Sequence, residues 1–241
     1  MIIVGHRGAR NEAPENTLES FVHAYQHGCR HFELDVQLSQ DKQLIVFHDT
    51  TLKRTTGHRG RMTDFTAQEL SNFDARLNTP GWPRPCPIPS LKTVVDALPD
   101  VSHWQFEVKT DSRLRLSIIA EQLIHFISAR KLEERATITS SNRWILKQVK
   151  KRSIRSSTGL VAESRLYDPV KSATALGCDY LCLSDKLVSA KRVHDARKKG
   201  LHCSVWTVND LKRMNELRQL GVDSVITDVP SKALTFMSAS V

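Results

Sequence analysis

The segment Lys198-Lys199-Gly200-Leu201-His202-Cys203-Ser204-Val205-Trp206 ends a helical pattern with a glycine and continues at once as an apolar run of strand length. Glycine is the residue most typical of a left-handed helix C-cap. The same order of helix, glycine and strand recurs at Gly28, Gly177 and Gly221. The strands that these four junctions predict span residues 29–36, 178–183, 201–206 and 222–226.

Further strands are predicted at residues 2–5, 104–110, 136–139 and 157–161. Helical patterns alternate with them: one opens at a capping box of Asn16 and Glu19, one carries an apolar stripe over 116–127, and one begins at Asn142. Eight strands alternating with helices predict an α/β fold, a closed (β/α)₈ TIM barrel. The 241 residues are close to the roughly 250 typical of that barrel, so we expect residues 1–241 to form a single domain.

Residues 49–87 interrupt this regular alternation. The segment is rich in Thr, Arg, Gly and Pro, and its prolines exclude a single helix. We interpret it as a small insertion in the connection between the second strand and the helix that follows. A short helix is expected near residues 67–73, and the insertion is expected to lie over the catalytic mouth of the barrel.

The composition restricts partners and cellular location. A formal net charge of +9 favours anionic partners. The densest basic cluster, residues 147–152, is interpreted as the solvated end of an outer helix, and no nucleic-acid-binding pattern accompanies it. We therefore expect no nucleic-acid partner. The sequence gives no signal for an oligomeric state.

Five cysteines occur without a zinc-binding spacing, and their odd number argues against a complete disulfide framework. Buried reduced thiols are the expected state. Met1–Val4 leads directly into the first strand, unlike a signal peptide, and no apolar run is long enough to cross a bilayer. These features predict a cytoplasmic protein without stable membrane insertion.

Acidic side chains are paired on two of the predicted strands. Glu33 and Asp35 are two residues apart and point the same way, so they repel unless a cation lies between them. Their hard oxygens suit Mg²⁺ or Ca²⁺. Glu107 would add a third carboxylate, and Lys109 on the same face would approach a phosphate. Solvated charges are the alternative, but a parallel sheet covered on both faces has no solvated side.

Two imidazoles and a guanidinium follow predicted strand ends. His6 and Arg7 follow the first strand, and His48 follows another short apolar run. Together with the carboxylates they suggest chemistry on a phosphate ester. The other histidines are interpreted as structural or exposed residues, with His202 in the core. Asp228 is interpreted as a helix cap.

Several motifs resemble the signature of the glycerophosphodiester phosphodiesterases. The likeness covers nearly the whole chain in the family's order, and it is weakest over residues 136–184. The motifs that carry it are His6-Arg7-Gly8, Pro14-Glu15-Asn16-Thr17, residues 33–41, Phe47-His48-Asp49, residues 52–57, residues 88–91, Glu107-Val108-Lys109, residues 205–209 and residues 221–230.

This resemblance implies a barrel enzyme that hydrolyses glycerophosphodiesters, the deacylated phospholipids, to sn-glycerol 3-phosphate and an alcohol. A divalent cation is implied, with Mg²⁺, Ca²⁺ and Mn²⁺ as candidates, and the implied partner is a small anionic phosphodiester. By position, the implied metal ligands are Glu33, Asp35 and Glu107, the acid–base pair is His6 and His48, and the substrate contacts are Arg7, Lys109 and Trp206.

Several alternatives stay open at the sequence level. His6 is assigned as base and His48 as acid, although the order could be reversed. The attacking group is either water or the substrate's own glycerol hydroxyl, and the alcohol could be choline, ethanolamine, glycerol or inositol. A related barrel lipase acting on lysophospholipid or inositol lipid, and a noncatalytic nucleic-acid binder, are the alternative functions.

Overall fold

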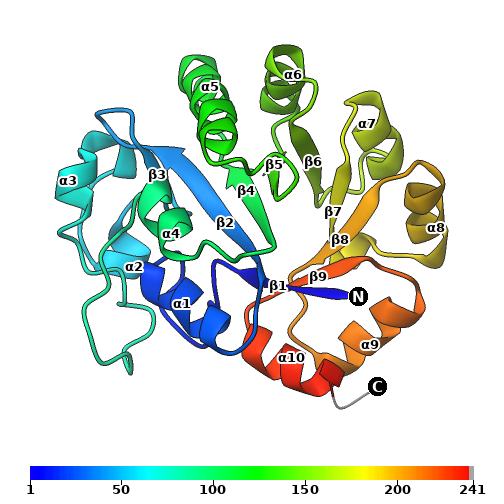
Figure 1. Cartoon of the computed structure of the whole chain (residues 1–241), viewed down its shortest axis with the longest axis horizontal. Helices are drawn as coiled ribbons and strands as arrows, with labels where there is room; N and C mark the ends of the chain where they lie inside the picture. Colours follow the sequence, from blue (N-terminus) through cyan, green and yellow to red (C-terminus); the bar gives the residue numbers. More distant parts are fainter. Residues whose placement is uncertain (239–241) are drawn as a thin grey trace.

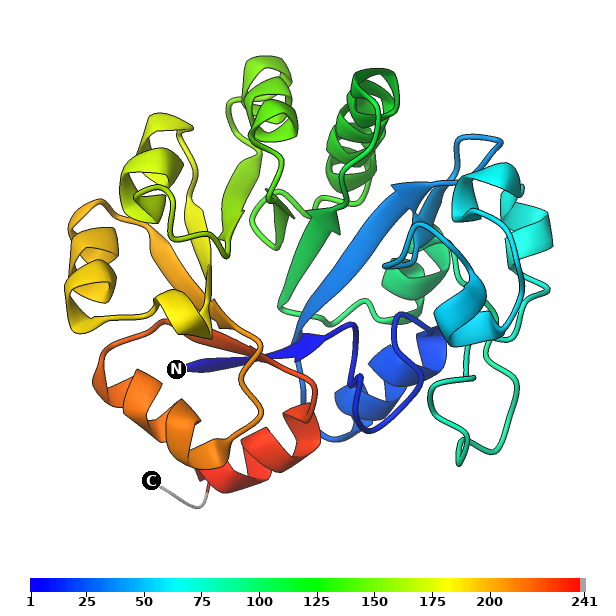
Figure 2. The ribbon, with the colours of Figure 1, turned by 180° about the vertical axis from the view of Figure 1, so that it is seen from behind.

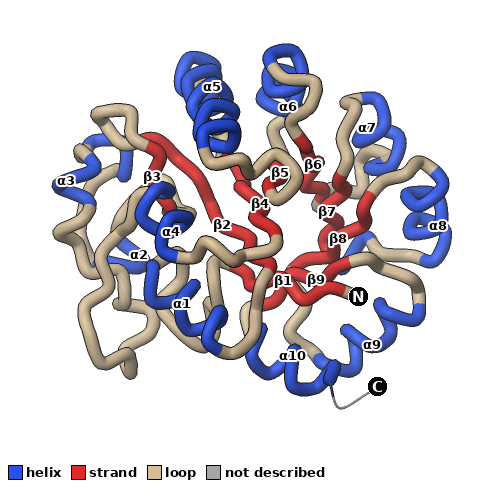
Figure 3. The backbone as a smooth tube through the Cα atoms, in the orientation of Figure 1, coloured by secondary structure: helices blue, strands red, loops and turns tan. Residues whose placement is uncertain are grey.

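The computed structural model describes residues 1–238, which form a closed parallel barrel surrounded by helices (Figures 1 and 3). Strand β1 pairs with both β9 and β2, and this closes the ring. The strands are β1 (Ile2–His6), β2 (His31–Leu38), β3 (Leu44–Val46), β4 (His103–Val108), β5 (Ala136–Ser140), β6 (Ser157–Ala162), β7 (Tyr180–Ser184), β8 (His202–Trp206) and β9 (Ser224–Thr227).

Helices follow the barrel strands and pack outside them, as the view from behind also shows (Figure 2). The helices are α1 (Leu18–Gln26), α2 (Lys53–Thr56), α3 (Ala67–Leu70), α4 (Leu91–Ala97), α5 (Arg113–Ala129), α6 (Arg143–Arg152), α7 (Pro169–Ala175), α8 (Ala190–Lys198), α9 (Leu211–Gln219) and α10 (Pro230–Ser238), with short 3₁₀ turns at Met62–Asp64 and Asp185–Leu187. The TIM barrel predicted from the sequence is confirmed.

The glycine junctions are confirmed, because Gly28, Gly177, Gly200 and Gly221 all have positive φ angles. Strands start one or two residues later than predicted, since each left-handed cap is followed by a short turn before the ladder begins. The predicted capping box is wrong. Thr17, whose hydroxyl accepts from the backbone N–H of Ser20, caps α1 instead of Asn16.

Residues 49–87 contain α2, α3 and a 3₁₀ turn but no barrel strand. Their apolar side chains form a small cluster with those of β3 that is separate from the main core. Strand β3 is the short apolar strand that was expected to end before His48, and it lies outside the eight strands of the alternating pattern. It runs antiparallel to the end of β2 and carries the chain back toward the barrel mouth.

The predicted reduced thiols are confirmed, because all five cysteines are buried and unpaired. Within residues 1–238, no helix combines the length and the apolar character that a membrane crossing requires.

Three stacked rings lie at the amino-terminal end of the barrel. His103, Tyr180 and His202 are the first residues of β4, β7 and β8. The ring of Tyr180 stacks on both imidazoles, at centroid distances of 5.4 Å to His103 and 4.3 Å to His202. Nε2 of His103 lies 3.0 Å from the hydroxyl of Thr137. Burial, and then the charges of His31 and His202, lower the pKa of His103 to about 4.

The free energy of unfolding is therefore expected to fall on acidification. In the unfolded chain His103 has a pKa near 6.5 and binds a proton below that pH. In the folded protein His103 stays neutral until the pH reaches about 4. The contribution of neutral His103 to the free energy of unfolding is thus fully present above pH 6.5. It is lost as the pH falls toward 4, and the loss amounts to up to about 3 kcal/mol. Denaturant unfolding of wild type and His103→Phe between pH 7 and 4 measures the effect.

The phenylalanine variant keeps the ring stack but cannot titrate, so its stability is expected to depend less steeply on pH. His194→Gln, on the exposed side of α8, is the matched control and should keep the wild-type slope. An equally steep pH dependence of stability in wild type and His103→Phe would show that His103 does not cause the loss of stability in acid.

Candidate active site

The register of the strands brings the predicted acidic residues together. In the pairing of β1 with β2, His6 lies opposite Glu33, and in the pairing of β2 with β4, Asp35 lies opposite Glu107. Glu33 and Asp35 are two residues apart on one strand and therefore share a face. The four side chains meet toward the carboxyl ends of neighbouring strands, which is where barrel enzymes carry their active sites.

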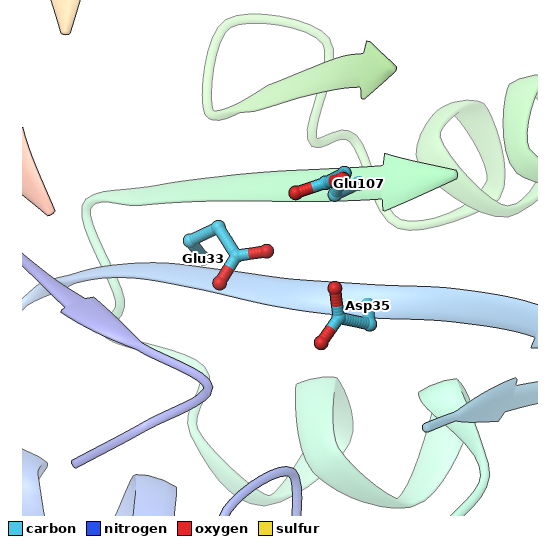
Figure 4. A group of neighbouring side chains, drawn as sticks. All are labelled: Glu33, Asp35 and Glu107. Atoms are coloured by element: carbon cyan, nitrogen blue, oxygen red, sulfur yellow. The ribbon is translucent and has the colours of Figure 1, made fainter. Parts of the chain in front are cut away.

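Glu33, Asp35 and Glu107 form a compact group of carboxylates (Figure 4). One oxygen from each lies within 4.8 Å of those of the other two. Asp35 is fully buried, and Glu33 is nearly so. Oε1 of Glu33 is buried without a hydrogen-bond partner among the described residues. Burial, followed by the charges of Asp35 and Glu107, raises the pKa of Glu33 well above its usual range.

This donor set fits a divalent cation. Three hard carboxylates from two strands converge, one buried oxygen lacks a partner within residues 1–238, and burial together with mutual repulsion disfavours the charge on Glu33. Mg²⁺ and Ca²⁺ prefer such oxygen ligands. The three residues predicted as metal ligands could therefore hold a metal ion.

Two cationic side chains partly offset the acidic charge. Nζ of Lys109 lies 2.7 Å from Oδ1 of Asp35 and 2.6 Å from Oε1 of Glu107. The guanidinium of Arg7 is buried and contacts Asp35 at 3.1 Å and Glu15 at 2.7 Å. Although burial acts to raise it, the charges of Lys109 and Arg7 hold the pKa of Asp35 below its usual range.

His6 is held by a carboxylate from the other end of the chain. Its Nδ1 lies 2.6 Å from Oδ1 of Asp228, whose second oxygen accepts from the side-chain amide of Asn209 at 2.7 Å. Nε2 of His6 then points toward Glu33, at 3.8 Å from Oε2. The interpretation of Asp228 as a helix cap is wrong. Helix α10 begins at Pro230, two residues later, and the carboxylate of Asp228 bonds to His6 and Asn209 instead of to the helix.

Strand β3 positions His48. The backbone N–H of Phe47 donates to the carbonyl of Asp35, which places the next residue beside the carboxylates. Nδ1 of His48 lies 2.6 Å from Asp49, and Asp49 pairs with Arg54 of α2. Burial, with further contributions from the charges of Arg7 and Lys109, lowers the pKa of His48.

Glu15 links the two histidine regions. Its carboxylate accepts from Arg7, from Arg54 and from the amide of Asn78. Burial acts to raise its pKa, but the hydrogen bonds of Arg54 and the charge of Arg7 lower it to about 2. Glu15 is therefore a fixed anion that orients two guanidinium groups. The sequence placed it in a motif but indicated no role.

A cavity of about 350 Å³ is lined by all of the predicted site residues except the fully buried Asp35. The indole N–H of Trp206 donates to the carbonyl of Cys182 at 3.1 Å, so the ring is fixed at the cavity wall. Glu163, which follows β6, also lines the cavity. It was not predicted, because the family likeness is weakest in that part of the sequence.

Comparison with protein families agrees with this geometry. The model of the glycerophosphoryl diester phosphodiesterase family matches residues 6–232. A glycerophosphodiester phosphodiesterase of Caldanaerobacter subterraneus subsp. tengcongensis is 32% identical over 237 residues, covering 98% of this chain and 97% of that protein. Lysophospholipase D GDPD1 of Mus musculus is 26% identical over 274 residues, covering 98% of this chain and 85% of that protein.

Solved structures share the barrel. A putative glycerophosphoryl diester phosphodiesterase from Silicibacter pomeroyi superposes with a TM-score of 0.92 at 20% identity, covering 100% of this chain and 94% of that one. A phosphodiesterase from Oleispira antarctica, solved in complex with its product sn-glycerol-3-phosphate, gives 0.91 at 24% identity, with 99% and 97% covered. At these identities the likeness concerns the fold.

Proposed function

The chain belongs to the glycerophosphoryl diester phosphodiesterase family and is a phosphoric diester hydrolase, and from that premise we propose that two histidines cleave its substrate by acid–base catalysis at a site that would hold a divalent cation. The substrates are glycerophosphodiesters, small anionic molecules that are cleaved to sn-glycerol 3-phosphate and an alcohol. The cation is Mg²⁺, Ca²⁺ or Mn²⁺, with Glu33, Asp35 and Glu107 as its ligands.

One observation carries this proposal. Three mutually close carboxylates and two imidazoles, each imidazole with its Nδ1 on an aspartate, are grouped at a single cavity, and all of them except the buried Asp35 line it. Phosphodiester cleavage requires that negative charge be neutralised, that a nucleophile lose a proton and that an alkoxide gain one. This set of groups can meet all three requirements.

Charge neutralisation is assigned to the basic groups and the cation. When bound, the cation supplies Lewis-acid stabilisation of the phosphate oxygens. Lys109 would exchange its carboxylate partners for a phosphate oxygen once those carboxylates hold a cation. Arg7 keeps its ion pairs with Glu15 and Asp35 and contributes positive charge from the cavity wall.

Proton transfer is assigned to the histidines. A carboxylate can only accept, so Asp228 and Asp49 keep the protons on Nδ1 of His6 and His48 and leave each Nε2 available. His6 acts as base and takes the proton of the attacking oxygen on its free Nε2, whereas His48 starts as the imidazolium and gives its Nε2 proton to the leaving alcohol. A transient cyclic phosphate in the time course would identify the glycerol hydroxyl as the attacking group, and a reaction without it would identify water.

Removal of metal tests the proposal directly. Protein treated with chelator is expected to lose about 10²-fold or more in release of glycerol 3-phosphate, because the cation supplies several kcal/mol of stabilisation. Restoring Mg²⁺, Ca²⁺ and Mn²⁺ separately identifies the cation. Offering glycerophosphodiesters with choline, ethanolamine, glycerol or inositol identifies the alcohol. Full activity in chelator with every substrate would refute the metal-dependent mechanism.

A cytosolic location is part of the proposal. It is supported by five buried cysteines that form no disulfide, the state that reducing compartments maintain.

A further inference from the structure

Three neighbouring loops supply both the wall of the cavity and a strip of its outer rim. Thr110, Ser141 and Glu163 line the cavity, and each lies a few residues before a helix, α5, α6 or α7. These helices stand side by side along one arc of the ring (Figure 1). The first residues of each helix and the loop before α7 therefore form the rim on the catalytic side.

Ring contacts make this rim strip continuous. The guanidinium of Arg113 lies 6.0 Å from the ring centre of Trp144, the second residue of α6. The guanidinium of Arg143 lies 4.3 Å from the ring centre of Tyr167, just before α7, and also bonds to Ser172 within α7. The rim thus presents aromatic rings covered by arginines across three successive barrel units.

Two leucines project from this rim into solvent. Leu114 is 74% exposed and Leu166 is 96% exposed. Isolated exposed leucines are common on protein surfaces. Here both belong to the loops or helix starts that border the cavity, and each is preceded by an exposed arginine, Arg113 or Arg165.

The three arginines of the rim are not held in ion pairs within residues 1–238. Arg113, Arg143 and Arg165 form no ion pair with any carboxylate in residues 1–238, in contrast to Arg115 nearby, which pairs with Asp111. Guanidinium groups beside exposed leucines, a tryptophan and a tyrosine match the chemistry of the bilayer interface, where anionic headgroups lie above acyl chains.

We propose that the rim strip of Arg113, Leu114, Arg143, Trp144, Arg165, Leu166 and Tyr167 docks the protein on an anionic phospholipid surface. The inference goes beyond hydrolysis of soluble diesters. Docking in this orientation turns the mouth of the cavity toward the lipid surface. Binding is peripheral and reversible, because two leucines and three arginines give only modest membrane affinity.

Co-sedimentation with vesicles tests the surface. The wild-type protein is expected to bind vesicles of phosphatidylcholine mixed with phosphatidylserine, to bind pure phosphatidylcholine much more weakly, and to dissociate at high salt. Leu114→Ser and Leu166→Ser should each lower the partition constant about tenfold. Arg143→Gln and Arg165→Gln should each lower it about fivefold.

The opposite end of the barrel offers a matched control. Ile154 is 84% exposed between α6 and β6, also beside arginines, but away from the cavity mouth. Ile154→Ser should bind vesicles like wild type. Melting temperatures verify that all variants fold, and hydrolysis of soluble glycerophosphodiesters should be unchanged in the leucine variants.

Several results would overturn the docking surface. These are failure of wild type to bind anionic vesicles at low salt, equal losses in Ile154→Ser and Leu166→Ser, or a loss of self-association rather than of vesicle binding in the leucine variants. A failure of the proposed function has a different signature, because soluble diesters would then not be cleaved at all while vesicle binding could persist.

Discussion

Glu33→Gln is expected to lower cation-dependent release of glycerol 3-phosphate by about 10²–10³-fold while making the metal-free protein more stable to heat. Two opposite requirements meet at this residue. As an anion, Glu33 is disfavoured by burial and by the charges of Asp35 and Glu107, which together raise its pKa. As a ligand, the same anion supplies an oxygen that no described residue satisfies. The glutamine amide keeps the shape of the side chain and removes its negative charge.

The measurements separate the two effects. Melting temperature in chelator should rise in Glu33→Gln relative to wild type, whereas added cation should raise it in wild type only, because ligand binding stabilises the form that binds. Calorimetric titration should show weaker cation binding in the variant. Glu134→Gln, an exposed substitution between α5 and β5, is the control for loss of one acidic charge. Undiminished activity of Glu33→Gln would exclude Glu33 as a ligand.

Local periodicity was sufficient to predict most of this carboxylate group. Glu33 and Asp35 share a face because a strand has a two-residue period, and Glu107 joins them because parallel strands of one barrel end at the same rim. The glycine caps fixed the order of helices and strands, and thereby the barrel itself. These features depend on neighbours within a few residues, which a single sequence contains.

Contacts that depend on chain reversal or on distant pairing could not be predicted in the same way. A short strand was expected before His48, but the antiparallel pairing of β3 with β2 that brings His48 to the site depends on a chain reversal. Asn16 looked like a helix cap, but it has a positive φ and its amide donates to Asp35, so tertiary contact overrode the local motif. Asp228 and His6 are 222 positions apart. Asp228 follows β9 at the barrel rim where His6 ends β1, and that was the available signal.

Asp228→Asn is expected to lower kcat by about 10²–10⁴-fold with little change in KM or in cation affinity. Asp228 is a positioning residue, since its carboxylate lies on Nδ1 of His6, is 5% exposed and is itself held by Asn209. An amide at this position can donate to Nδ1, which would drive the proton to Nε2 and remove the basic nitrogen that faces Glu33. Nitrogen NMR of His6 reports which tautomer is present.

Asp223→Asn provides the matched control, because Asp223 lies at the other end of β9 and accepts from the backbone of Cys203. It removes a carboxylate beside the same strand and should alter stability without altering kcat. The double variant of His6→Gln with Asp228→Asn decides whether Asp228 acts only by positioning His6. If Asp228 acts only through His6, the double variant is no slower than His6→Gln alone, since residues acting as a unit are not additive. Additive losses would instead assign Asp228 a contact with the substrate that is independent of the imidazole.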